Sequence, residues 1–169
     1  GTVAQQERWV PELLTMEKIG AWAITEPGSG SDAFGSMKSS AKRDGNGGYI
    51  LNGSKTFITN GPFADTIVFI CKLDEGNPPP ERKVLSFVLD SGMPGLTQSK
   101  PLRKMGMHSS PTGELFLDDV RVGKDRLIGE DEDQAGYDLA FENSDVVFVS
   151  EDVNAADVNI KLTTAPIGV

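Results

Sequence analysis

Short runs of apolar and β-branched residues, separated by turn-forming residues, fill most of the chain before residue 130. Their lengths and their alternation with polar positions are typical of strands. Strands are predicted over residues 20–25, 37–43, 49–51, 55–59, 66–73, 84–90 and 114–120. A hairpin turn is predicted at Asn52-Gly53, because this residue pair favours the tight turn between two antiparallel strands.

The spacing of these runs predicts the fold class. Short strands joined by glycine-rich turns predict a mainly β fold, an antiparallel β-barrel or sandwich. Helical patterns do not alternate with the strands, so a parallel Rossmann sheet is not expected. With 169 residues, 38% of them apolar, the chain is expected to form a single domain with an appendage at most.

A short helix is predicted before the first strand. Thr2 and Gln5 have the spacing of a capping box, in which each residue satisfies the backbone of the other at the start of a helix. Trp9 and Leu13 belong to a set of apolar residues that recur at helical spacing. Pro11 is expected to bend or end this helix, because proline lacks the amide hydrogen that the helix needs.

The pattern changes after about residue 130, where many of the acidic residues gather. A short amphipathic helix is predicted at 134–143 and strands at 146–149 and 158–162. The formal net charge of −9 argues against a nucleic acid as partner. Because much of this charge is confined to the end of the chain, it says little about a binding site elsewhere.

Composition limits the compartment and the architecture. No apolar run is long enough to predict a membrane span, and no signal-like segment is present. Cys71 is the only cysteine, which excludes an internal disulfide and favours a reducing, intracellular compartment. The chain begins with Gly1 rather than methionine, which suggests a processed chain or a fragment of a longer one.

The residues that follow the first predicted strand form a loop with the sequence Glu-Pro-Gly-Ser-Gly-Ser-Asp. Gly28 and Gly30 allow successive backbone N–H groups to turn toward one point, where they can hold an anion such as a pyrophosphate. Ser29 and Ser31 add hydroxyl groups. A flexible surface loop is the more common interpretation of such a segment. It is not the dinucleotide-binding fingerprint, because a strand rather than a helix follows.

A second candidate site lies in the predicted strand at 55–59. Phe57 and Thr59 project to one face of a strand and Ile58 to the other. An aromatic ring beside a hydroxyl group suits a flat heteroaromatic ligand, which stacks on the first and bonds the second. An ordinary strand with one aromatic residue is the alternative interpretation.

His108 is the only histidine, which limits two further classes of site. A cluster of histidines around a metal is excluded, and a Ser-His-Asp triad has one candidate base. No serine lies in a Gly-x-Ser-x-Gly nucleophile motif. His108 is therefore interpreted as a polar surface residue or a packing residue of a loop.

Taken together and in order, several segments closely resemble the acyl-CoA dehydrogenase family. The resemblance covers about residues 1–133 and assigns 17–133 to the flavin-binding middle β-barrel domain. Residues 1–16 correspond to the last helix of an N-terminal helical domain, and 134–169 form a divergent acidic tail. The segments that carry the resemblance are AWAITEPGSGSDAFG, YILNGSKTFITNGPFADTIVFI, FVLDSGMPGLTQSKPLRKMGMHSSPTGELFLDDVRV and RLIGED.

The resemblance implies that the first loop and strand wrap FAD. Trp22, Ile24 and Thr25 would contact the pyrimidine edge of the flavin, through backbone N–H groups and the threonine hydroxyl. Gly30 and Ser31 would hold the pyrophosphate. Ser31 would also lie near the CoA portion of the thioester substrate.

The resemblance also gives roles to the second strand. Phe57, Ile58 and Thr59 would back the isoalloxazine ring, with the Thr59 hydroxyl directed at flavin N5. Many members of the family carry tryptophan at the position of Phe57, and either aromatic ring can stack on a flavin.

The family reaction is the FAD-dependent α,β-dehydrogenation of an acyl-CoA thioester. A carboxylate removes the α-proton, the β-hydride passes to the flavin, and an electron-transferring flavoprotein accepts the electrons. The implied protein is a homo-oligomer of the bacterial cytoplasm or the mitochondrial matrix.

The catalytic base is not recognisable in this chain. In the family, a C-terminal helical domain supplies a catalytic glutamate, and residues 134–169 are too short and too strand-like to match it. No catalytic residue and no metal ligand is assigned. Glu26 belongs to the flavin loop rather than to the position of proton abstraction. An alternative interpretation is a non-catalytic module that binds flavin or acyl-CoA, or serves as an interaction scaffold.

Overall fold

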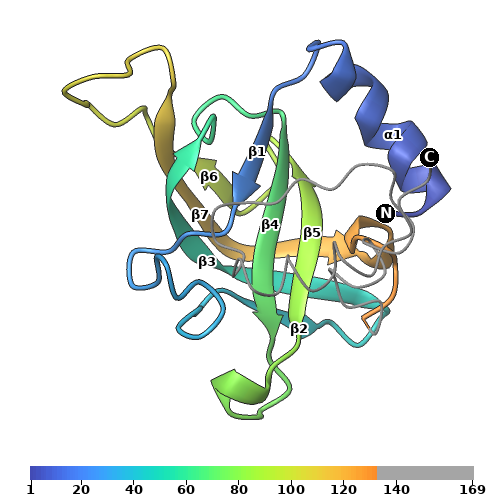
Figure 1. Ribbon diagram of the computed structural model, residues 1–169. Coiled ribbons are helices and arrows are strands. Elements are labelled where there is room, and N and C mark those ends of the chain that lie inside the picture. Colours follow the sequence, from blue (N-terminus) through green and yellow to red (C-terminus); the bar gives the residue numbers. More distant parts are fainter. Residues whose placement is uncertain (133–169) are drawn as a thin grey trace, which may run out of the picture. The chain divides into compact units, whose positions relative to one another are not determined.

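The computed structural model describes residues 1–132. The helix predicted at 134–143 and the strands predicted at 146–149 and 158–162 lie outside the described residues. Within them, the chain forms one α-helix, two short 3-10 helices and seven strands (Figure 1). The elements are α1 (Val3–Leu14), β1 (Gly20–Ala23), β2 (Ser40–Arg43), β3 (Gly48–Thr59), β4 (Thr66–Leu73), η1 (Pro79–Glu81), β5 (Val84–Asp90), β6 (Leu96–Gln98), β7 (Thr112–Gly123) and η2 (Lys124–Arg126).

The strands form one sheet in the order β1-β4-β2-β3-β7-β6, with β5 paired to β4. This arrangement confirms the prediction of a mainly β fold. The pairing itself is mixed rather than antiparallel throughout, because β1 and β2 both run parallel to β4. The strand path does not close on itself among the described residues.

The parallel pairing of β1 and β2 with β4 explains why the chain between these two strands forms a long loop. β5 pairs with β4 along Thr66 to Lys72, so β1 and β2 share the opposite edge of β4. β1 lies along the first half of β4, and β2 meets its last two residues. The chain between Ala23 and Ser40 therefore leaves the sheet and returns to the same edge. The strand predicted at 37–43 is therefore shorter in the structure. Residues 37–39 belong to the loop, and β2 begins at Ser40.

The predicted hairpin at Asn52-Gly53 is wrong, because both residues lie inside the long strand β3. The pairing with β7 shifts register between Leu51 and Gly53, which is a β-bulge. Gly53 has a φ of +153°, and a Cβ atom there would lie 2.9 Å from Cα of Ser39. Gly53 therefore permits the returning loop to approach the strand, instead of making a turn.

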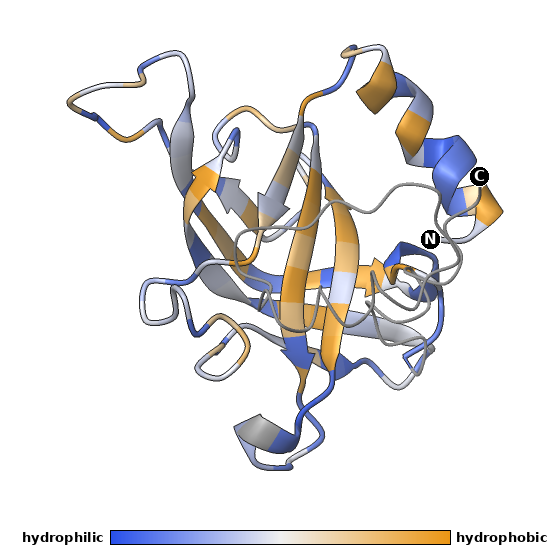
Figure 2. Ribbon diagram, viewed as in Figure 1, coloured by the Kyte–Doolittle hydropathy of each residue, from blue (hydrophilic) through white to orange (hydrophobic). Residues whose placement is uncertain are grey.

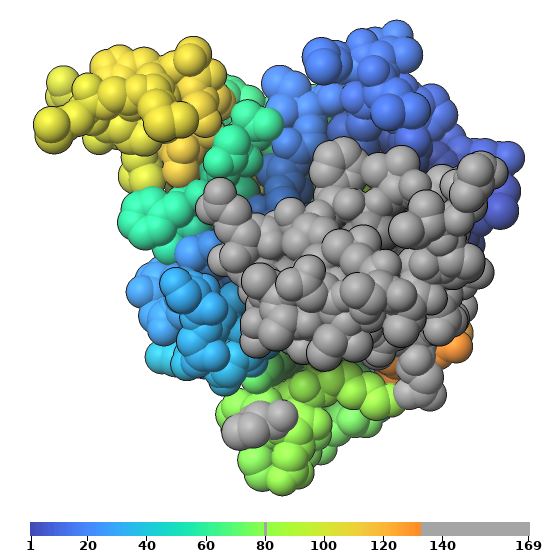
Figure 3. Space-filling view, in the orientation of Figure 1, coloured from blue at the N-terminus to red at the C-terminus, as the bar shows by residue number. Residues whose placement is uncertain are grey.

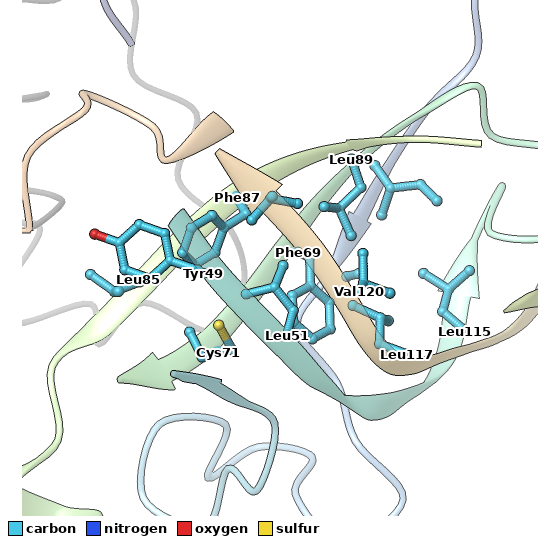
Figure 4. Packing of buried hydrophobic residues seen from close by; sticks show 14 of the residues in the cluster. Tyr49, Leu51, Phe69, Cys71, Leu85, Phe87, Leu89, Leu115, Leu117 and Val120 are labelled. Atoms are coloured by element: carbon cyan, nitrogen blue, oxygen red, sulfur yellow. The ribbon is translucent and has the colours of Figure 1, made fainter. Parts of the chain in front are cut away.

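The hydrophobic core is enclosed by the curved sheet (Figure 4). Figure 4 shows the side chains of β3, β4, β5 and β7 meeting there, with Phe69 among residues from the other three strands. The ring of Tyr49 packs edge-on against Phe87, with a centroid distance of 5.0 Å. The hydropathy colouring shows the same concentration of apolar residues along β4 and β5 (Figure 2). A smaller core of Ile24, Ala33, Met37 and Ile70 lies under the 24–39 loop.

Helix α1 begins with the predicted capping box. The Thr2 Oγ accepts a hydrogen bond from the Gln5 backbone N–H, and the Gln5 Oε1 accepts one from the Thr2 N–H. The Gln5 side-chain amide also donates to the carbonyl of Leu127, 2.7 Å away, which ties the helix to the chain after β7. Pro11 lies inside the helix, which continues to Leu14, so Pro11 does not end it. No helix among residues 1–132 has both the length and the apolarity to cross a membrane.

Candidate functional site

The chain just after β1 lies beside the second half of β3. The Thr56 backbone N–H donates to the Thr25 carbonyl oxygen at 2.9 Å, and the Asn60 side chain donates to the Gly20 carbonyl at 3.3 Å. These two contacts show that residues 20–25 and 56–60 run antiparallel. Both segments lie on the side of the molecule that carries the 24–39 loop (Figure 1).

Three of the predicted side chains in these two segments are exposed. Trp22 is 51% exposed and Phe57 67% exposed, and Thr59 is also exposed. Ile58 is 2% exposed and belongs to the main core, while Ile24 lies in the smaller core. The predicted alternation of Phe57, Ile58 and Thr59 is therefore confirmed. The two isoleucines can meet a ligand only through their backbone.

Phe57 has an unusual backbone conformation. Its φ is +55°, a left-handed value that bulky residues rarely adopt. The register between β3 and β7 shifts here a second time, between Lys55 and Ile58, so Phe57 occupies a second β-bulge. The bulge re-aims the ring outward. Strain of this kind is characteristic of functional positions.

The loop after Thr25 has a fixed beginning and an open tip. Glu26 and Ser29 exchange two backbone hydrogen bonds, of 3.0 and 3.1 Å, around Pro27 and Gly28. The buried Ser29 hydroxyl donates to the carbonyl of Asp32, 2.7 Å away. Gly30, which follows, is exposed, and a Cβ atom there would meet nothing within 4 Å. The space around the tip suits a ligand that approaches the backbone closely.

The exposed residues of this loop and the end of β3 lie on one side of the molecule. In the space-filling view, the loop appears in blue beside the green residues that follow β3 (Figure 3). Gly30 and Ser31 are both exposed on the loop, as the prediction of an anion site requires. The anion site itself stays a prediction.

Beneath the junction lies a buried ion pair that the sequence analysis missed. Lys55 is completely buried, and its Nζ lies 2.9 Å from the Glu26 Oε1. The same Nζ donates to the carbonyl of Ile24, also at 2.9 Å. The Glu26 carboxylate accepts two more hydrogen bonds, from the backbone N–H groups of Lys38 at 2.7 Å and Ser39 at 2.9 Å. Glu26 is thus held by structural contacts at both ends of the loop and with β3.

Burial and hydrogen bonding act on the pKa values of this pair in opposite directions. Burial tends to raise the pKa of Glu26, but the hydrogen bonds from Ser39, Lys38 and Lys55 outweigh it and hold the pKa below its ordinary value. Burial lowers the pKa of Lys55, and Glu26 opposes that shift. The carboxylate is therefore ionised at neutral pH, stabilised by donors on every side.

Neither His108 nor Cys71 lies among the residues of the candidate site. His108 is exposed, and its Nε2 lies 2.8 Å from the carbonyl of Lys104 in the same loop. Cys71 is buried in the main core, and this burial raises the pKa of its thiol. Among residues 1–132, no three histidine, cysteine, aspartate or glutamate residues are grouped to hold a metal ion.

A cavity of about 380 Å³ lies at the other end of β3, away from this junction. Two of the charged side chains that line it, Arg43 and Glu132, pair with each other. Arg43 forms ion pairs with Glu75 and Glu132, and the Tyr49 hydroxyl donates to Glu132 at 2.6 Å. The junction of β1 and β3 is the better candidate, because it presents exposed aromatic and hydroxyl groups that a ligand could contact.

Comparison with known proteins decides the family. Residues 21–120 match the family model described as the middle domain of acyl-CoA dehydrogenase, and this segment is more than half of the chain. The chain belongs to the acyl-CoA dehydrogenase family. The segment runs from β1 to the middle of β7 and contains every residue of the candidate site.

Curated members of the acyl-CoA dehydrogenase family support this assignment. The chain is 44% identical over 131 residues to the mitochondrial isovaleryl-CoA dehydrogenase of Pongo abelii. It is 41% identical over 133 residues to the short-chain specific acyl-CoA dehydrogenase of Megasphaera elsdenii. Each alignment covers 78% of this chain but only 30% and 33% of those proteins. The chain thus spans about a third of the length of the curated relatives it matches.

Solved structures of the acyl-CoA dehydrogenase family share the fold. The enzyme from Geobacillus kaustophilus superposes with a TM-score of 0.69 at 43% identity, over 75% of this chain and 33% of that one. A glutaryl-CoA dehydrogenase from Mycobacterium smegmatis, in complex with FADH2, gives 0.68 at 34% identity, over 76% of this chain and 31% of that one. The resemblance noted in the sequence is therefore confirmed.

Proposed function

We propose that this chain is the flavin-binding part of an FAD-dependent dehydrogenase that introduces an α,β double bond into acyl-CoA thioesters. The convergence of two segments carries the proposal: Trp22, Phe57 and Thr59 are exposed on two segments that the Thr56–Thr25 hydrogen bond joins, and an open glycine loop follows the first of them. Membership of the acyl-CoA dehydrogenase family supports it, as does the flavin recorded with one structural relative.

The residues of the junction fit a flavin. Phe57 offers exposed aromatic surface for a flat ring, and Trp22 would meet the pyrimidine edge through its backbone N–H group. The Thr25 carbonyl oxygen accepts the hydrogen bond from the Thr56 N–H. The hydroxyl and the N–H of Thr25 would meet the pyrimidine edge. The Thr59 hydroxyl would bond flavin N5. Ile24 and Ile58 would contribute backbone groups, because their side chains are buried.

The loop would serve the charged part of the cofactor. Gly30 and Ser31 would hold the pyrophosphate through backbone N–H groups and a hydroxyl, and Ser31 would also lie near the CoA portion of the substrate. When bound, FAD would supply the acceptor for the hydride that leaves the substrate. The chain's own part in this chemistry is to bind and orient the ring and to keep water from it.

The complete protein is proposed to act on an acyl-CoA substrate as a homo-oligomer and to pass electrons to an electron-transferring flavoprotein. A bacterial cytoplasm or a mitochondrial matrix is the proposed location. The base that removes the α-proton is not assigned to any described residue. Residues 17–133 are proposed as the middle domain, residues 1–16 as the end of a preceding helical domain, and residues 134–169 as a divergent acidic tail.

Titration of the 169-residue chain with FAD tests the proposal. Stacking on Phe57 should quench flavin fluorescence in a saturable manner, and Phe57→Ala should weaken binding. Leu14→Ala, which removes an exposed apolar side chain from α1, is the matched control and should leave binding unchanged. Binding that is unaffected by Phe57→Ala would overturn the proposal.

A further inference from the structure

Three contacts from β3 hold the chain that follows β1. The Lys55 Nζ donates to the Ile24 carbonyl, the Thr56 N–H donates to the Thr25 carbonyl, and the Lys55 Nζ pairs with the Glu26 carboxylate. Three consecutive residues are thereby fixed by two consecutive residues of β3. All three contacts measure 2.9 Å.

The same ion pair also fixes the far end of the loop. The Glu26 carboxylate accepts hydrogen bonds from the N–H groups of Lys38 and Ser39, just before β2 begins. One carboxylate thus joins the first residues of the 24–39 loop, its last residues and β3. The exposed residues Gly30 and Ser31 lie in the part of the loop between these anchors.

Stability alone is a weak reason for burying such a pair. Removing both charges from water costs several kcal/mol per ion, and well-packed apolar pairs are often as stable. The ammonium group also lies 5.2 Å from the centre of the Phe69 ring in the core, where an aliphatic side chain would pack as well. What an apolar pair cannot do is hold one carbonyl and two backbone N–H groups in fixed directions.

We propose that Lys55 and Glu26 are positioning residues that hold the segment 24–26 and the ends of the 24–39 loop in the geometry that receives FAD. This inference rests on the proposed function for its ligand, and on the contacts above for its mechanism. Neither side chain contacts the ligand, since both are buried beneath the exposed surface. They act through the backbone that does.

The decisive variant replaces the pair as a whole. Lys55→Met with Glu26→Leu leaves no isolated buried charge, so the chain should still fold, and its melting temperature provides the check. FAD binding should weaken about tenfold or more, because a loosely held site must be ordered at the expense of binding energy. Amide hydrogen exchange at Lys38, Ser39 and Thr56 should accelerate by a similar factor. The single variant Glu26→Gln, nearly isosteric, should show the same changes in a smaller degree.

Arg126→Met is the matched control. Arg126 also pairs with a carboxylate, that of Asp90 at 2.6 Å, and donates to a backbone carbonyl, that of Val88 at 3.1 Å. Arg126 lies in η2, however, and both of these partners lie in β5. It should lower the melting temperature without changing FAD affinity or exchange at Lys38 and Ser39. Exchange and affinity that change no more in the double variant than in this control would overturn the inference.

The two proposals fail in different ways. A lack of saturable FAD binding by the unsubstituted chain contradicts the proposed function, and the exchange rates at Lys38, Ser39 and Thr56 then decide the positioning role. Normal binding by the double variant contradicts the positioning role and leaves the proposed function standing.

Discussion

The backbone N–H of Thr56 donates a 2.9 Å hydrogen bond to the carbonyl oxygen of Thr25. This bond joins the end of the β1 segment to the strand that carries Phe57 and Thr59. Trp22, Phe57 and Thr59 are all exposed on the two segments that this bond joins. The flavin site proposed for this chain depends on that junction.

Thr59→Val should weaken FAD binding by the 169-residue chain about two- to tenfold, the effect of losing one hydrogen bond of roughly 0.5–1.5 kcal/mol. Thr97→Val, at an exposed threonine of β6, is the control and should have no effect. Flavin fluorescence titration measures both. Equal affinities for the two variants would show that the Thr59 hydroxyl does not contact the ligand.

Gly53→Ala should lower the free energy of unfolding by about 1–3 kcal/mol, the usual cost of overpacking. Its φ of +153° and the 2.9 Å approach of Ser39 Cα leave no room for a methyl group. Gly28→Ala is the control, because a Cβ atom there meets nothing within 4 Å. Urea denaturation should separate the two variants clearly, and a neutral Gly53→Ala would contradict the close packing of the loop on β3.

Much of this fold could be predicted from residue patterns, and the exceptions have physical causes. Runs such as 66–73 and 84–90 are apolar enough to specify β4 and β5 without tertiary information. The hairpin predicted at Asn52-Gly53 was wrong because Gly53 is required by a close contact with Ser39. This contact is long-range, so the local sequence does not reveal it. The parallel pairing of β1 and β2 with β4 is also long-range.

The site was predictable in part for the same reason. Alternation alone placed Phe57 and Thr59 on one face and Ile58 on the other, as the structure confirms. The family resemblance supplied Trp22 and Thr25, and only the structure showed that these segments meet. The Lys55–Glu26 pair was missed. A lysine inside a predicted strand was its one signal, and the partner could not be known without the fold.

Glu26→Gln should remove part of the pH dependence of stability. The folded protein holds the pKa of Glu26 below its ordinary value of 4.5, so as pH falls the unfolded chain takes up this proton first. The stabilisation is complete above that value and is lost as pH falls through the lower, folded pKa. At neutral pH the variant should be about 3 kcal/mol less stable, because Lys55 remains buried without its charge partner.

This difference should shrink in acid, and urea denaturation across pH 7 to roughly pH 3 measures it. Glu81→Gln, at an exposed carboxylate of η1, is the control and should leave the profile of the native chain unchanged. A difference between the Glu26 variant and the native chain that grows as pH falls would contradict the direction of the pKa shift.

Phe57→Asn should leave stability within about 0.5 kcal/mol of the native value or raise it, which is unusual for removing an aromatic residue from a strand. Phe57 is 67% exposed and has a φ of +55°, a conformation that asparagine tolerates well. The same substitution should weaken FAD binding through loss of the stacking surface. Thermal unfolding and fluorescence titration test the two effects, and a large loss of stability would show that the ring contributes to the core.

Chemical-shift mapping of the 169-residue chain during an FAD titration tests the central claim most directly. The backbone amides of Trp22, Thr25, Phe57 and Thr59 should shift together, along one binding curve, with those of Gly30 and Ser31. Shifts confined to the Arg43 and Tyr49 cavity at the other end of β3, or shifts in one of the two segments without the other, would contradict it.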